Sequence, residues 1–137
     1  MRQIKFRGYN EKSGVWIYGF YLQNRGAHFV CPDEFANGKT WEDYEVVPES
    51  VGQCLGVKDS QGNEIYEGDI VEVFISRRFI DGKLIERCAQ YRVFYDTTFA
   101  EFKFDCIKDS LNIGGMETAG MLFSVDTSKV VGNSYGT

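Results

Sequence analysis

Apolar and polar residues alternate with a period of two along several short stretches of the chain. Over residues 2–7, Ile4 and Phe6 fall on one face and Gln3 and Lys5 on the other, which is the pattern of a half-buried strand. Alternation or dense aromatic content predicts further strands over residues 15–22, 27–31, 64–66, 70–80, 83–95, 99–104, 121–125 and 129–131. No segment carries a sustained period of 3.6 residues, and only a single helical turn is expected, near residues 40–43.

The strongest local signal is the dipeptide Asp81-Gly82 between two long strand patterns. These residue types accept the positive φ angles of a two-residue type I′ hairpin turn. We therefore expect residues 70–80 to pair antiparallel with residues 83–95 as a long two-stranded ribbon.

Short strands separated by glycine turns favour a barrel or a two-layer β arrangement. The 137 residues are enough for one small closed barrel with an additional β-sheet subdomain. We expect a single unit over residues 1–137, subdivided into an N-terminal β subdomain over residues 1–52 and the barrel, with its long hairpin, over residues 53–137.

Composition supports a folded, β-rich chain, because 43% of residues are hydrophobic and 15% aromatic. The formal net charge of -5 argues against non-specific attraction to nucleic acid or to a membrane surface. The charge is uneven: residues 1–32 carry five basic residues against one Glu, whereas residues 33–72 carry eleven acids against two Lys. Such blocks are most often solvated faces, but their complementarity makes head-to-tail self-association, and so a homo-oligomer, physically reasonable.

The four cysteines, Cys31, Cys54, Cys88 and Cys106, form no closely spaced pair, and His28 is the only histidine. This spacing does not suit a zinc site, so no metal or other cofactor is expected. No segment has the pattern of a secretory signal, and no apolar run approaches the roughly 20 residues that span a bilayer. We expect a cytoplasmic protein with reduced thiols.

No catalytic constellation is apparent, and we expect no enzyme activity. His28 lies on a predicted strand between Ala27 and Phe29, where a structural role is favoured over that of a general base. The acids at residues 64–72 match no calcium loop, and neither a phosphate-binding loop nor a dinucleotide fingerprint is present.

One group of charges stands above this background. The predicted ribbon and its continuation gather basic residues that are candidate nucleic-acid contacts: Arg77, Arg78, Lys83, Arg87 and Arg92. Phe79 and Tyr91 lie among them and could stack on unpaired bases, and a basic ribbon can also enter a major groove. The competing interpretation is an exposed edge that charge keeps soluble.

Three passages carry a resemblance to a known family. They are Ile4-Lys5-Phe6-Arg7, the stretch Gly62-Asn63-Glu64-Ile65-Tyr66-Glu67-Gly68-Asp69-Ile70-Val71, and Val130-Val131-Gly132-Asn133. In this order and spacing the chain resembles the YopX family of phage and prophage proteins, whose function is uncharacterised. The resemblance implies a mostly-β fold with an SH3-like C-terminal barrel and a phage or prophage origin, and with that origin a place in the bacterial host cytoplasm. It implies no catalytic residues.

These observations leave two functional hypotheses ahead of an enzyme. The first is a non-enzymatic module that binds a protein partner or further copies of itself. The alternative is a nucleic-acid-binding accessory protein that uses the basic hairpin at residues 76–92.

Overall fold

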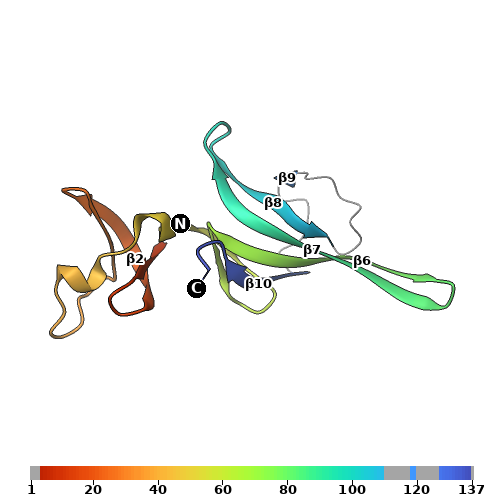
Figure 1. Ribbon diagram of the computed structural model, residues 1–137, viewed down its shortest axis with the longest axis horizontal. Coiled ribbons are helices and arrows are strands. Elements are labelled where there is room, and N and C mark those ends of the chain that lie inside the picture. The colour runs from red at the N-terminus through yellow and green to blue at the C-terminus, as the bar shows by residue number, and fades with distance from the viewer. Residues whose placement is uncertain (1–3, 110–117, 120–126, 137) are drawn as a thin grey trace. The chain divides into compact units, whose positions relative to one another are not determined.

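The computed structural model describes residues 4–109, 118–119 and 127–136 (Figure 1). Within these residues the fold is all β, with ten strands, two short 3-10 turns and no α-helix. The chain divides into two compact units, Met1–Gly56 and Val57–Thr137.

The first unit is an antiparallel sheet in the order β3-β2-β1-β4. Its elements are β1 (Phe6–Asn10), β2 (Val15–Asn24), β3 (Ala27–Cys31), the 3-10 turns η1 (Trp41–Tyr44) and η2 (Pro48–Ser50), and β4 (Gly52–Lys58). Strand β4 runs across the division at Gly56, and in the sheet order it is followed by β5 (Glu64–Tyr66).

The first strand lies further along the chain than the alternation predicts. It extends to Asn10, which pairs with Val15 across the turn. The Asn10 side chain accepts a hydrogen bond from the Ser13 amide at 2.8 Å, and this bond closes the turn. Strand β1 therefore includes residues 8–10, beyond the predicted end at residue 7, whereas Ile4 lies outside the strand and is largely exposed.

The loop after β3 packs back on the first unit. The Val47 amide donates to the Tyr9 carbonyl and the Val46 amide donates to the His28 carbonyl, both at 2.9 Å. Val46 is buried directly over Gly8, where an added Cβ would come within 2.7 Å of the valine side chain. The glycine therefore permits the loop to lie against β1.

The second unit is an antiparallel sheet in the order β10-β6-β7-β8-β9. Its strands are β6 (Asp69–Ile80), β7 (Lys83–Asp96), β8 (Glu101–Asp109), β9 (Thr118–Ala119) and β10 (Ser128–Asn133). The side chains that fill its core are Ile65, Val71, Val73, Val93 and Phe104, each at most 1% exposed. These residues come from β5, β6, β7 and β8, so the core depends on all four strands.

The long hairpin is confirmed. Ile80 pairs with Lys83, and Asp81 and Gly82 have φ angles of 52° and 76°. The strand expected at residues 99–104 begins instead at Glu101, because Ala100 has a left-handed φ of 53° and belongs to the turn. The short strand Thr118–Ala119 was not expected, and the strand expected at residues 121–125 lies outside the described residues.

An all-β fold with two antiparallel sheets is thus confirmed. The described strands of the second unit form an open sheet, with β10 at one edge and β9 at the other. Closure would require hydrogen bonds between those two edges, and no such pairing is found among the described residues. The SH3-like barrel stays a prediction.

Candidate interaction surfaces: the β-arm and the acidic hollow

Among the described residues, strands β6 and β7 extend beyond their neighbours in the sheet. The pairing of β10 with β6 ends at Val73, and the pairing of β8 with β7 ends at Ala89. In the part of the chain that the structure describes, residues 74–88 form ladder pairs only with one another. We call this two-stranded segment the arm, and Figure 1 shows it running out from the sheet of the second unit.

The register of the hairpin sorts the arm's side chains into two faces. A bulge at Ile75 shifts the pairing between Phe74 and Ser76. Because side chains alternate along a strand and cross-strand partners share a face, one face holds Phe74, Arg77, Phe79, Leu84, Glu86 and Cys88. The other holds Ser76, Arg78, Ile80, Lys83, Ile85 and Arg87.

We call the face that holds Phe74 and Phe79 the aromatic face. Its two charged residues, Arg77 and Glu86, form an ion pair. The Arg77 guanidinium lies 2.8 Å from a carboxylate oxygen of Glu86 and 5.6 Å from the centre of the Phe74 ring. Phe79 is 75% exposed and its cross-strand partner Leu84 is 48% exposed. The outer end of this face is therefore an exposed apolar pair.

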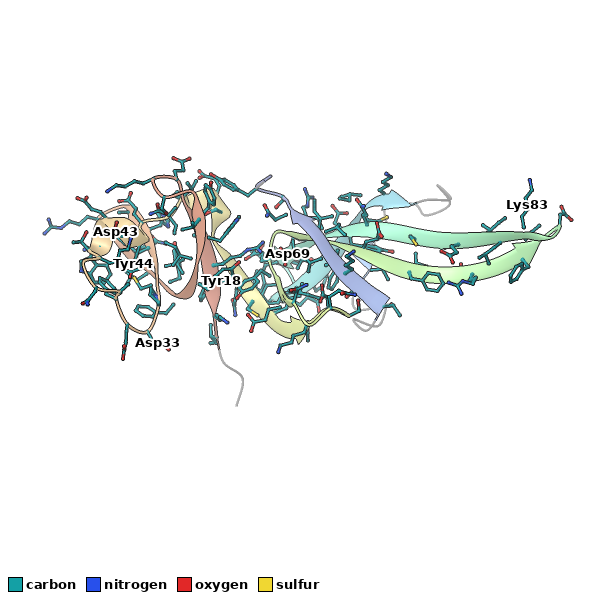
Figure 2. The ribbon with its side chains drawn as sticks, turned by 90° about the horizontal axis from the view of Figure 1, so that it is seen from below. Tyr18, Asp33, Asp43, Tyr44, Asp69 and Lys83 are labelled. Carbon is teal, nitrogen blue, oxygen red and sulfur yellow. The ribbon has the colours of Figure 1, made fainter. Side chains whose placement is uncertain are left out.

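The second, the basic face, combines three cations with two isoleucines. Its cations are Arg78, Lys83 and Arg87, and its register positions include no Asp or Glu. Figure 2 shows Lys83 at the outer end of the arm. Ile80, the partner of Lys83, is 50% exposed, so apolar and basic groups are presented together.

The five candidate nucleic-acid contacts therefore do not form one surface. Arg78, Lys83 and Arg87 share the basic face, whereas Arg77 points to the opposite face. Arg92 lies outside the arm, where β6, β7 and β8 all pair, and its guanidinium is 3.0 Å from the Asp105 carboxylate.

The first unit carries a second surface that the sequence analysis did not anticipate. An open hollow of about 710 Å³ lies beside the end of β1. Glu11, Glu42 and Glu45 line it, with Lys12 as the opposing charge, and its apolar lining is Val46, Val47 and Pro48. We call this surface the acidic hollow.

Asn10 fixes the wall of the acidic hollow. It is 2% exposed, and its side-chain amide donates to the Asp43 carbonyl at 3.2 Å and to the Glu45 carbonyl at 2.8 Å. The same side chain closes the β1–β2 turn that carries Glu11. One buried amide thus holds both the turn and the segment around η1 in place.

The segment beside the hollow is aromatic as well as acidic. The ring centroids of Phe35 and Trp41 are 5.1 Å apart and those of Phe35 and Tyr44 are 4.5 Å apart. The Thr40 amide donates to the Asp43 carboxylate at 2.9 Å, and this bond lowers the pKa of that carboxyl. Figure 2 shows Asp33, Asp43 and Tyr44 in this part of the first unit.

His28 belongs to a polar cluster on the β2–β3 hairpin. Its Nδ1 atom lies 2.5 Å from the Tyr21 hydroxyl, and this hydroxyl accepts a hydrogen bond from the Gln23 side-chain amide at 2.7 Å. Cys31 and Cys54 are buried, and burial raises the pKa of the Cys31 thiol.

Across residues 4–109, 118–119 and 127–136, no three Asp, Glu, His or Cys side chains cluster in a way that could hold a metal ion. No helix of the described chain is long and apolar enough to cross a membrane.

The family model described as YopX protein matches residues 5–137. The chain belongs to the YopX family. None of the curated proteins matches it at a significant level.

The longest of the three passages that carry the family resemblance, residues 62–71 and called the motif below, is a folding element of the second unit. Asp59, just before the motif, accepts hydrogen bonds from the amides of Gln61, Asn63 and Val130 at 2.8–2.9 Å. Within the motif, Gly62 and Gly68 have φ angles of 83° and 91°, which favour glycine. Its members Ile65, Tyr66 and Asp69 lie inside and are exposed by 0%, 3% and 1%. The signature therefore ties the turn to β10 and fills the core, and it leaves the arm and the acidic hollow as the exposed surfaces with distinctive chemistry.

Proposed function

We propose that this YopX-family chain is a non-enzymatic protein-interaction module and that the arm is its contact surface. The observation that carries the proposal is the exposure of Phe79, Ile80 and Leu84 on a two-stranded segment without further ladder partners among the described residues. A lone hairpin is only marginally stable in water, and large apolar side chains at its end add nothing to the core. A protein partner would bury them and complete the packing of the arm.

Site-specific photocross-linking in cells that express the full chain tests this proposal. A benzophenone amino acid replaces Phe79, and the matched control carries it at Val131, which is 44% exposed on β10. We expect a protein adduct from position 79, sensitive to protease and resistant to nuclease, and none from position 131. Equal adducts at both positions, or none at either, would contradict the proposal.

The basic face supports a second candidate, a nucleic-acid-binding accessory protein. Arg78, Lys83 and Arg87 lie on one side of a two-stranded ribbon, and two-stranded ribbons can enter a major groove. Three phosphate contacts on duplex DNA predict a log–log salt slope of about -2.7, at about -0.9 per contact. The aromatic face would contribute nothing to this slope, because Arg77 is paired with Glu86 on the other side.

Fluorescence anisotropy with single- and double-stranded oligonucleotides separates the two candidates. If nucleic acid is the ligand, Arg78→Ala with Lys83→Ala should flatten the salt slope by about two contacts, and Arg77→Ala should leave it unchanged. If protein is the ligand, no binding is expected at about 50 μM protein in low salt, which is within the range where non-specific DNA binding is normally seen.

A further inference from the structure

We infer that the acidic hollow is the docking site for the basic face of the arm from a second copy of this chain. The inference rests on the proposed function, since it gives the arm one specific partner. It joins the second unit of one molecule to the first unit of another.

The charges of the two surfaces are opposite. The arm carries four basic residues against Asp81 and Glu86, a balance of +2, and its basic face holds three of the four. Residues 33–45, which supply part of the hollow, carry five acids against Lys39, a balance of -4. Opposite potentials across an interface favour encounter and fix its register.

The apolar groups also match. Ile80 and Ile85 lie beside the cations of the basic face, and Val46, Val47 and Pro48 line the hollow together with its three glutamates. A volume of about 710 Å³ is in the range of pockets that enclose a small ligand, ~300–1,000 Å³, and is large enough for the side chains at the end of a hairpin. Docking would therefore bury isoleucine against aliphatic lining while each ammonium or guanidinium meets a carboxylate.

The hollow exists before docking. Asn10 anchors Asp43, Glu45 and the β1–β2 turn through bonds that involve no arm residue. A preformed site loses little conformational entropy when it is filled. The arm and the hollow are different surfaces, so the contact is heterologous, and each copy can accept one arm and donate another.

Sedimentation of the full chain with charge-reversed variants tests the docking. The arm variant is Arg78→Glu with Lys83→Glu, and the hollow variant is Glu42→Lys with Glu45→Lys. The wild-type chain should sediment above the monomer mass of 15.6 kDa in low salt and dissociate as salt rises. Each variant alone should associate at least about tenfold more weakly, because like charges then meet in the hollow.

Mixing the two variants is the decisive measurement. The arm variant has an acidic arm, which can dock in the basic hollow of the hollow variant. The hollow variant keeps its basic arm, which can dock in the acidic hollow of the arm variant. Association should therefore return. Restored association also shows that both variants are folded. The controls, Glu49→Lys in η2 and Lys129→Glu in β10, each reverse one charge at an exposed position that belongs neither to the hollow lining nor to the arm, and they should associate as the wild type does.

A wild-type chain that stays monomeric at about 100 μM in low salt would overturn the inference. So would a mixture of the variants that does not associate, or a control that loses association. The proposed function fails separately: a monomer that still gives a protein adduct from position 79 refutes docking between copies and keeps the arm as a contact surface. A monomer without that adduct refutes both.

Discussion

Replacing Asp59 by alanine should destabilise the second unit more than any nearby exposed substitution. Asp59 is 6% exposed, and its carboxylate accepts three backbone amide hydrogen bonds, one of them from Val130 in β10. A hydrogen bond to a charged group contributes about 1.5–3 kcal/mol, and the three are not fully additive. We expect the free energy of unfolding to fall by about 3–5 kcal/mol, a large part of the ~5–15 kcal/mol typical of a domain.

The measurement combines urea unfolding, followed by far-ultraviolet circular dichroism, with hydrogen exchange at the Val130 amide. Both tryptophans lie in the first unit, so their fluorescence would not follow this change. Exchange at Val130 should accelerate in Asp59→Ala because its acceptor is gone. The matched control is Ser60→Ala at the next, exposed position, which should change the unfolding free energy by less than about 0.5 kcal/mol.

The same carboxylate should make stability depend on pH. Burial alone would raise the pKa of the Asp59 carboxyl, but the amides of Val130, Asn63 and Gln61 together lower it below its usual value. The ionised Asp59 carboxylate therefore makes its full contribution to the free energy of unfolding above the unfolded-state pKa of about 3.9. This contribution is lost as the pH falls through the lower pKa of the folded state. The difference in unfolding free energy between wild type and Asp59→Asn should shrink over that acidic range. A constant difference from pH 7 to 2, or an Asp59→Ala chain as stable as wild type, would refute the reasoning.

Three further predictions concern the first unit and the thiols. Asn10→Ala should lower the free energy of unfolding of the first unit by about 2–4 kcal/mol, read by tryptophan fluorescence in urea, because buried carbonyls lose their donor. Gly19→Ala should cost at least about 2 kcal/mol in the same assay, since the new Cβ would lie 1.9 Å from the Cys31 carbonyl oxygen. Gly132→Ala in the second unit meets nothing within 4 Å and should be tolerated when unfolding is followed by circular dichroism. All four thiols should react with a thiol reagent in denaturant without prior reduction, and the buried Cys31 and Cys54 should be the slow pair in the native protein; an intact mass short by two hydrogens would contradict this.

The arm could be predicted from sequence because its determinants are local. Asp81-Gly82 sets a two-residue turn, and the turn fixes the pairing of Ile80 with Lys83 and of every position before the bulge. That Arg77 and Arg78 face opposite sides also follows from the period of two. The place where the arm begins could not be predicted, because it depends on where β8 and β10, distant in sequence, stop pairing.

The acidic hollow was beyond the reach of the same reasoning. Its lining comes from a turn near residue 11 and from two 3-10 segments more than thirty residues later, joined by the Asn10 side chain. A period of two or of 3.6 carries no information about such a contact, because neither segment has regular side-chain alternation. The available signal was compositional: Phe35 and Trp41 stand in a run of acids, and exposed aromatic residues are common in contact surfaces.

The charge distribution favours a second copy over nucleic acid as the partner of the basic face. Residues 33–72 carry a balance of -9, eleven acids against two Lys, and this block would repel a polyanion approaching the arm of the same molecule. For a second copy the attracting surface is the acidic hollow, which takes Glu42 and Glu45 from this block. Salt weakens both kinds of complex, so ionic strength alone does not distinguish them. Charge reversal does, because nucleic acid has no positive form: an arm made acidic can recover binding only against a protein surface that has been made basic.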